Sequence, residues 1–248
     1  MDPHQRAAAF ARISNELLAE REEQPTLQSI VDLAVQTVPG CELAGVSVRR
    51  GRGRVETPAS TSPLVDRVDA LQYDLDEGPC LEAIRTDDTY IVDDSAIDPR
   101  WPRWGPKVAA LGLRSILTVR LSPHDVQDVL GGLNLYAGGT HAFTEDDVEI
   151  AQVYAAHAAG ALDAAQVVTG LRTAMHTRHT IGVAQGLLMQ RYGLSLDRSF
   201  EVLVRFSREH NVKLRVVADG VVESGSFPVD DNLVDNADVE ADLEEAVT

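Results

Sequence analysis

The sequence predicts an α+β domain built on an antiparallel sheet, followed by a small all-α bundle. Segments that alternate apolar and polar residues predict strands within the first 140 residues or so, and helical patterns stand before, between and after them. From about residue 170 onward the apolar spacing is helical only. A long helical pattern that begins at Thr144 joins the two parts. We therefore expect one sheet flanked by helices and a separate helical module after it.

The elements of the first part can be placed in order. Pro39 and Gly40 end a helix, and in the strand that follows Val46 and Val48 face one side while Ser47 faces the other. In chain order we expect helices at 4–24 and 25–38, strands at 41–50 and 55–61 joined by a hairpin turn, helices at 63–75 and from about Cys80 through Ile84, a strand at 90–92, a helix in the second half of 99–111, strands at 115–121 and 129–136 separated by a polar loop at 122–128, and a helix capped by Thr144 and Asp147.

Composition narrows the class of protein. The chain has 248 residues, of which 44% are hydrophobic and 25% charged, as in a globular protein. No apolar run approaches the roughly 20 residues of a membrane helix, and the first six residues lack the apolar core of a secretory signal, so we expect a cytoplasmic protein with no membrane partner. Cys41 and Cys80 are too few for a disulfide framework or a Cys-rich zinc site. No metal spacing is visible among the histidines, and the sequence identifies no cofactor.

Charge is distributed unevenly along the chain. The formal net charge is -17, yet residues 170–223 carry eight basic against five acidic side chains, a net charge of +3. Residues 224–248 carry eight acidic side chains and neither Lys nor Arg, and this composition predicts disorder. A basic helical module in an acidic chain indicates a polyanion as partner, and charge alone leaves both RNA and DNA open. We hypothesise that the acidic tail competes with that polyanion for the basic module.

The helix that begins at Thr144 carries a heptad pattern. Apolar or small residues recur at alternating steps of four and three, which is the spacing of a coiled-coil seam and favours a parallel homodimer. The alternative is a helix that packs on the sheet up to about Ala165 and then breaks near Gly170. The residues of the predicted seam are Ile150, Tyr154, His157, Ala161, Ala164, Val168, Leu171 and Met175.

Three short motifs carry a resemblance in the first part. They are EGPCLEA at 77–83, GLRS at 112–115 and LGGLNLY at 130–136. With them, the sequence from about His4 to Ala165 resembles a GAF domain, a module that senses small molecules and dimerises. The resemblance implies a site for a small-molecule ligand.

Candidate sensing residues follow from position and side-chain chemistry. Cys80 comes directly after Pro79 in the first turn of a helix, where the helix dipole would lower the pKa of its thiol, and Cys41 is a possible redox partner. The alternative is that each cysteine is a small buried hydrophobic residue. Asp93, Trp101 and Trp104 could line a ligand pocket, although tryptophans at this spacing also occur in an ordinary core.

The basic module carries a more specific resemblance. Its motif is A-x-x-x-R-x-x-I-x-x-A-Q-G-x-L-M-x-x-Y-G at 174–193, with F-x-x-L at 200–203 and K-L-x-x-V-A at 213–218 behind it. These residues resemble an ANTAR domain, a family of RNA-binding antiterminators that recognise paired RNA hairpins. Thr177 stands where many members have Ser, and Gln185 where many have Lys, which removes one charge from the expected RNA face. Three helices are expected, with Met175 and Phe200 among the apolar residues of their core.

The resemblance and the side-chain chemistry together give a set of RNA-binding candidates. The guanidinium group of Arg offers a planar fork of donors to phosphate and can stack on an unpaired base. Lys213 and Arg215 lie at the start of the third helix, where the backbone amides of the helix N-terminus also favour phosphate. For any of the arginines except Arg178, a solvated charge or an intramolecular pair is an alternative, and Arg178 could instead hold the bundle together. The candidates are Arg172, His176, Arg178, His179, Gln185, Arg191, Lys213 and Arg215.

The predicted function is that of a dimeric RNA-binding transcription antitermination regulator rather than an enzyme. A GAF-like sensor at 1–165 would respond to a small molecule or redox signal and control RNA-hairpin binding by an ANTAR-like bundle at 166–223, followed by the tail at 224–248. Two other classes stay open: a DNA-binding transcription factor, and a thiol-based GAF enzyme such as a methionine sulfoxide reductase that uses Cys80 and Cys41.

Overall fold

The computed structural model describes residues 3–51, 53–86, 88–122 and 130–225. The chain separates into two compact units, Met1–Thr169 and Gly170–Thr248. Residues 226–248 of the predicted acidic tail and 123–128 of the predicted loop fall outside the described residues. The domain boundaries at 165 and 223 stay predictions.

The elements of the first unit follow the predicted order. The strands at 90–92 and 115–121 have the predicted bounds, and the second helix begins two residues before Pro25 because the first helical turn tolerates proline. The elements are α1 (Pro3–Ala19), α2 (Glu23–Thr37), β1 (Leu43–Arg50), β2 (Arg54–Ser60), α3 (Pro63–Leu75), α4 (Pro79–Thr86), β3 (Tyr90–Val92), α5 (Gly105–Ala110), β4 (Ser115–Leu121), β5 (Gly131–Ala137) and the first part of α6 (Glu145–Tyr192).

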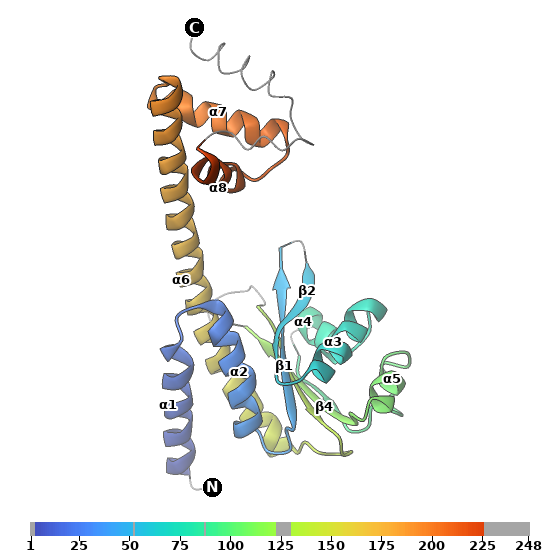
Figure 1. The fold of residues 1–248 in the computed structure, drawn as a ribbon. Coiled ribbons are helices and arrows are strands. Elements are labelled where there is room, and N and C mark those ends of the chain that lie inside the picture. Colours follow the sequence, from blue (N-terminus) through green and yellow to red (C-terminus); the bar gives the residue numbers. More distant parts are fainter. Residues whose placement is uncertain (1–2, 52, 87, 123–129, 226–248) are drawn as a thin grey trace. The chain divides into compact units, whose positions relative to one another are not determined.

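The five strands form one antiparallel sheet in the order β2-β1-β5-β4-β3. Helices α1 and α2 and the first part of α6 cover one face, and α3, α4 and α5 lie on the other (Figure 1). The α1–α2–α6 side holds the larger apolar core, to which β1, β4 and β5 contribute Val46, Leu117 and Leu133. The predicted α+β class and sheet are confirmed.

Alternation along β1 divides its side chains between the two faces as predicted. Val46 and Val48 are buried in the core beneath α2 and α6, while the Ser47 hydroxyl lies 2.6 Å from the Tyr73 hydroxyl of α3 on the other face. β5 approaches β1 so closely that a Cβ at Gly131 would lie 1.8 Å from the Ser47 carbonyl oxygen. Gly131 is therefore required by the strand pairing.

Helix α6 is continuous from Glu145 to Tyr192, so the predicted unbroken helix is confirmed and the break near Gly170 is wrong. Its start is a reciprocal cap, since the Thr144 hydroxyl accepts from the Asp147 amide at 3.3 Å and the Asp147 carboxylate accepts from the Thr144 amide at 2.9 Å. This pair fixes the first turn of α6.

The predicted seam is only partly available for a partner. Tyr154 is fully buried and Ala161 is 3% exposed, because both pack into the core of their own domain. For these two residues the seam prediction is wrong: the first part of α6 packs on the sheet, as the alternative proposed. Leu171 and Met175, in the second unit, are 61% and 71% exposed.

Candidate nucleic-acid interface

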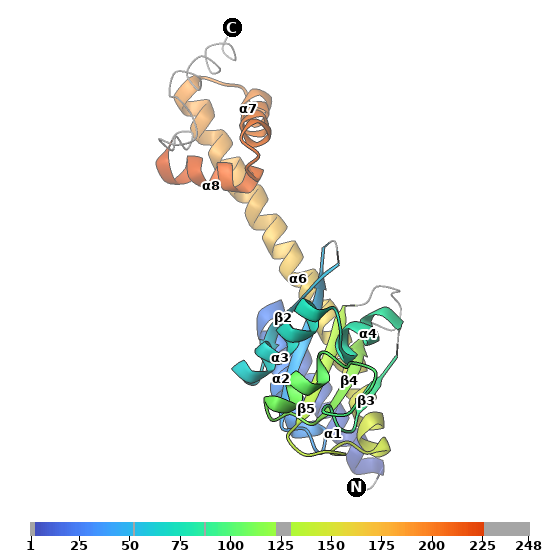
Figure 2. The same ribbon diagram turned by 90° about the vertical axis from the view of Figure 1, so that its right-hand side faces the viewer.

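The second unit is a three-helix bundle made from the last turns of α6, α7 (Leu196–Glu209) and α8 (Leu214–Ser224), and both views show α7 and α8 beside the end of α6 (Figures 1 and 2). Gly193 ends α6 in a left-handed conformation, with φ of +69°. Ser195 then caps α7 by accepting from the Arg198 amide at 3.2 Å. The buried core comprises Ala184, Leu188, Leu194, Val202, Leu203, Val217, Ala218 and Val221.

Two residues predicted for this core lie outside it. Met175 is 71% exposed and Phe200 is 42% exposed. Met175 lies more than one turn before Thr180, where burial between the helices begins, and Phe200 lies on a different side of α7 from the buried Leu203 and Ser199. Both core assignments were wrong, because apolar character does not by itself give the direction of a side chain.

A groove between α6 and α8 brings three predicted RNA-binding residues together. Its volume is about 370 Å³. The two arginines and the histidine supply cationic or donor groups for phosphate, and three threonines supply hydroxyls. Asp219 is the acidic residue of the lining. The lining residues are Arg172, Thr173, His176, Thr177, Thr180, Arg215 and Asp219.

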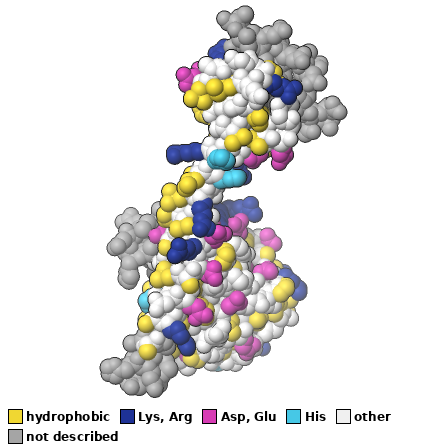
Figure 3. All heavy atoms as spheres, turned by 60° about the vertical axis from the view of Figure 1, so that its left-hand side comes forward, with side chains coloured by type: hydrophobic (Ala, Val, Ile, Leu, Met, Phe, Trp, Pro, Cys, Tyr) yellow, Lys and Arg dark blue, Asp and Glu magenta, His cyan; other side chains and the backbone are white. Residues whose placement is uncertain are grey.

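A fourth predicted residue lies beside this groove, and a fifth does not. His179 follows His176 by three residues and Arg172 by seven, so all three lie on one face of α6. Arg178, by contrast, lies on a different face, together with Gln185 seven residues later. Figure 3 shows His side chains together with Lys and Arg on the surface along this part of the chain. The sequence analysis therefore grouped as one RNA-binding set residues that lie on two different faces of α6.

The remaining predicted residues have partners within the bundle. Gln185 Nε2 donates to the Leu196 carbonyl at 3.0 Å and so ties α6 to the start of α7. Arg191 Nη1 donates to the Gly225 carbonyl at 2.9 Å, just beyond the end of α8. Lys213 is the residue before α8, and its backbone carbonyl accepts from the amides of the first turn. These contacts give each residue a structural role, and their part in RNA binding stays a prediction.

The sensing residues predicted in the first unit do not line one site. Trp101 and Trp104 are buried in the core on the α3–α5 side, edge to face with ring centroids 6.2 Å apart, and the Trp104 indole donates to the Val68 carbonyl. Asp93 is exposed, with its carboxylate 3.4 Å from the His141 Nδ1 atom. The tryptophans thus belong to an ordinary core, which was the alternative interpretation.

The predicted reactivity of Cys80 is contradicted. Cys80 does lie in the first turn of α4, but it is fully buried, and burial together with the nearby Asp69 carboxylate raises the pKa of its thiol to about 12. Burial outweighs the helix dipole because the thiolate is removed from water. Cys41 is also a free, buried thiol, and burial raises its pKa to about 12. Neither environment favours thiolate chemistry.

A buried polar network around Asp69 lies between the sheet and α3, and sequence reasoning missed it. The fully buried carboxylate accepts hydrogen bonds from the Thr57 hydroxyl at 2.9 Å, the Asn134 amide at 3.2 Å, the Gln72 amide at 3.2 Å and the Tyr136 hydroxyl. Burial raises the pKa of Asp69 to about 6, and these hydrogen bonds offset part of that effect. A signal was present in the sequence, because an aspartate at this position shares the apolar stripe of Val65 and Val68.

A surface pocket of about 440 Å³ opens beside this network. Tyr73 connects the two, since it lines the pocket and its hydroxyl lies 2.7 Å from the Thr57 hydroxyl. Arg49 and Arg85 line the same pocket, with Asp76 next to Arg85 in an ion pair.

Across the described ranges, no cluster of three or more His, Cys, Asp or Glu could hold a metal ion. No described helix is long and apolar enough to cross a membrane.

Comparison with protein families decides the identity of both units. A GAF domain model matches residues 20–163, more than half of the chain, and an ANTAR domain model matches residues 169–222. The chain belongs to the GAF family and carries an ANTAR domain. The predicted resemblance is thereby confirmed. A GAF sensor domain followed by an ANTAR RNA-binding domain supports an antitermination regulator.

Several solved structures share the fold of this chain at low sequence identity. The GAF domain of a phosphoenolpyruvate-protein phosphotransferase from Acinetobacter is 16% identical, with a TM-score of 0.52 over 68% of this chain and 98% of that chain. The corresponding domain from Coxiella burnetii is 15% identical, with a TM-score of 0.51 over 64% and 92%. A free methionine-R-sulfoxide reductase from Neisseria meningitidis is 16% identical, with a TM-score of 0.50 over 63% and 87%. These likenesses show the fold alone. No curated protein matches the chain.

Proposed function

We propose that the ANTAR domain binds RNA hairpins in nascent transcripts and that the GAF domain controls this binding in response to a small molecule. The observation that carries the proposal is the α6–α8 groove, in which Arg172, His176 and Arg215 meet. Two guanidinium forks and neighbouring hydroxyls form a surface suited to a phosphate backbone. The net charge of +3 over residues 170–223 supports a polyanion as partner in a chain that is acidic overall.

Salt-dependent binding tests the groove. The double variant Arg172→Ala/Arg215→Ala should bind an RNA hairpin at least about tenfold more weakly than the wild type at low salt. Its plot of log affinity against log salt should flatten by roughly 0.7–0.9 for each phosphate that the variant no longer neutralises. Arg198→Ala is the matched control, since Arg198 is an exposed arginine that pairs with Glu201 at 2.9 Å on α7. An unchanged slope in the double variant would exclude the groove as the phosphate site.

The same titration with duplex DNA separates RNA from DNA. We expect hairpin RNA to be preferred, and a preference for duplex DNA would favour the transcription-factor alternative. The thiol-enzyme alternative needs a reactive cysteine, and burial with raised pKa values at Cys80 and Cys41 argues against it. Reductase activity that disappears on replacing these cysteines by serine would reinstate it.

The small-molecule signal is proposed to act at the pocket beside Tyr73. This pocket combines two arginines with apolar walls from Leu81 and Ile84, and it adjoins the Asp69 network. A ligand there would contact α3 and α4 together. Differential scanning fluorimetry of wild type and Tyr73→Ala against a metabolite library tests the site: a ligand that stabilises both equally does not bind there.

The homodimer is part of the same proposal. Leu171 and Met175 lie one turn apart on α6 and are largely exposed, as expected for residues that a second copy of the chain would cover. The double variant Leu171→Glu/Met175→Glu should sediment as a monomer at concentrations where the wild type is a dimer. Gln190→Glu, an exposed position on the same helix, serves as control. A monomeric wild type would remove this part of the proposal.

A further inference from the structure

Three large apolar side chains lie exposed where α6 meets α7. Met189 is 36% exposed, Leu196 is 59% exposed and Phe200 is 42% exposed. The Gln185 amide, one turn before Met189, donates to the Leu196 carbonyl at 3.0 Å and so places the start of α7 against this part of α6. We refer to Met189, Leu196 and Phe200 as the Phe200 patch.

A cation and an open stretch of backbone lie on the same face of α6 as this patch. Arg178 precedes Gln185 by seven residues and Met189 by eleven, and both intervals are close to whole numbers of helical turns. Gly182 and Gly186 fall between them, and a Cβ added at either would meet no atom within 4 Å. A flat ligand can therefore approach the helix backbone closely between Arg178 and the patch.

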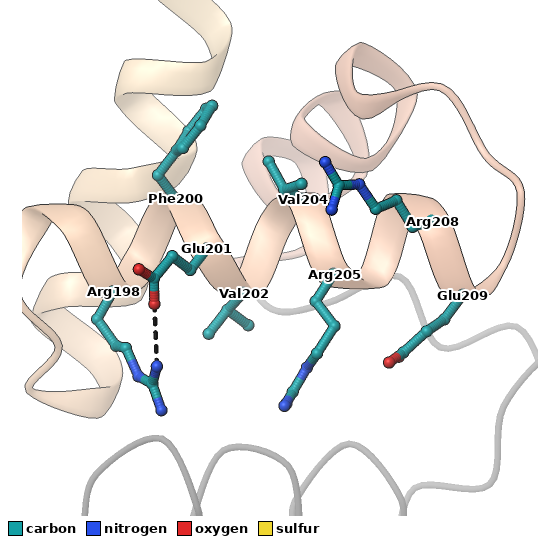
Figure 4. Close-up of a pocket in the computed structure, with 8 residues that line it drawn as sticks. All are labelled: Arg198, Phe200, Glu201, Val202, Val204, Arg205, Arg208 and Glu209. Atoms are coloured by element: carbon teal, nitrogen blue, oxygen red, sulfur yellow. Dashed lines mark hydrogen bonds and ion pairs between the residues drawn. The ribbon is translucent and has the colours of Figure 1, made fainter.

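A second cation lies beyond the patch on α7. Phe200, Val204 and Arg208 project from one side of this helix, whereas Arg198, Arg205 and Glu209 project from the other, and all six line one pocket along α7 (Figure 4). The latter side includes the ion pair between Arg198 and Glu201. The aromatic ring thus lies on the side of α7 that carries Arg208, with exposed arginines on both helices that form the patch.

We propose that the Phe200 ring stacks on an unpaired base of an RNA hairpin loop, while Arg178 and Arg208 contact the phosphates on either side of it. This inference rests on the proposed RNA-binding function and adds the part of the RNA that is recognised. Bases of a duplex are already stacked on one another and offer no free face, whereas loop bases can be splayed out onto an aromatic side chain. The groove at Arg172 and Arg215 lies on another face of α6, and its lining includes His176 but no Phe, Tyr or Trp.

The experiment uses the full-length protein and hairpins that the wild type selects from a pool with a fixed stem and a randomised loop. Phe200→Leu keeps the apolar bulk and removes the aromatic face, and it should weaken binding of a selected hairpin about tenfold with an unchanged salt slope. Leu196→Ala is the matched control within the patch and should bind within about twofold of the wild type. On a hairpin whose stacked loop base is replaced by an abasic site, Phe200→Leu and the wild type should bind equally.

Each other outcome overturns the inference in a recognisable way. Equal affinity of Phe200→Leu and the wild type for the intact hairpin would exclude stacking. If Phe200→Leu loses as much RNA affinity on the abasic hairpins as on the intact hairpin, the ring acts through folding of the domain. A lowered melting temperature of the ANTAR domain in this variant would show the same. A change in sedimentation with unchanged RNA affinity would make the patch a protein interface. If the wild type selects no hairpin, the proposed function fails together with this inference, whereas selection followed by normal binding of Phe200→Leu removes the inference alone.

Discussion

The Asp69→Asn variant should change how the stability of the GAF domain depends on pH. Asp69 is fully buried, and burial raises the pKa of its carboxyl group to about 6, compared with about 4 in an unfolded chain. A group whose pKa is raised by folding stabilises the folded state below its unfolded pKa. That stability is lost as the pH rises through the folded pKa. Asparagine stays neutral throughout, and its carbonyl oxygen can still accept from Tyr136.

The size of the effect follows from the two pKa values. A difference of about two units corresponds to about 3 kcal/mol over the whole titration, of which about 2 kcal/mol falls between pH 4.5 and pH 7.5. Other groups act in the opposite direction, since ion pairing with Arg114 lowers the pKa of Asp94. The quantity to compare is therefore the difference in unfolding free energy between Asp69→Asn and the wild type. It should shift by about 2 kcal/mol in favour of the variant between the two pH values.

Tryptophan fluorescence during urea unfolding is the assay. Both tryptophans of the chain, Trp101 and Trp104, lie in the buried cluster of the GAF domain, so their emission reports the unfolding of this domain alone. Asp66→Asn is the control, because Asp66 is exposed on the same helix. If the difference for Asp69→Asn is the same at both pH values, Asp69 does not titrate as described and the reasoning is refuted.

Three further predictions concern other parts of the chain. Gly131→Ala should prevent native folding of the GAF domain, because the new Cβ would lie 1.8 Å from the Ser47 carbonyl oxygen; native-like tryptophan emission from this variant would contradict the strand pairing. Ser195→Ala should destabilise the ANTAR domain by about 1 kcal/mol through loss of its hydrogen bond to the Arg198 amide, measured as a lower melting temperature by circular dichroism, whereas Ser195→Asp should restore the cap. Cys80, whose thiol pKa is raised to about 12, should resist Ellman's reagent at pH 8 until urea unfolds the domain, and rapid reaction in the native state would exclude the buried position.

Local patterns in the sequence were sufficient for most of the secondary structure. Strands at 90–92 and 115–121 were predicted with their observed bounds because alternation and flanking turn residues define such segments, and the Thr144–Asp147 cap followed from spacing alone. The heptad pattern failed at Tyr154 and Ala161 for a tertiary reason. A helix that packs on a sheet and a helix that packs on a partner need the same periodicity, so the pattern does not identify what covers it.

The candidate sites were harder to predict because side-chain environment depends on the whole fold. Proline before Cys80 correctly indicated the first helical turn. The predicted direction of the pKa shift of the Cys80 thiol was wrong, because the sequence alone does not show that α4 buries this side chain against the sheet. The basic residues of α6 were identified as a set. Their helical spacing divides them into two faces, but which face meets α8 and which meets α7 became evident only in the structure. Phe200 was assigned to the core because apolar character is a one-way guide to burial.

The side chains that α6 presents to the sheet have a consequence for conformational entropy. They are mostly alanines, namely Ala151, Ala155, Ala158, Ala159, Ala161 and Ala165. Alanine has no rotamers to lose on burial, whereas each leucine in its place would lose about 0.5–1 kcal/mol of rotamer freedom. This face of the helix is therefore buried with little loss of rotamer freedom, with Tyr154 and Leu162 as the exceptions. A larger residue at one of these buried positions would have to displace neighbouring atoms, so this face of the helix should vary far less among relatives than the exposed face.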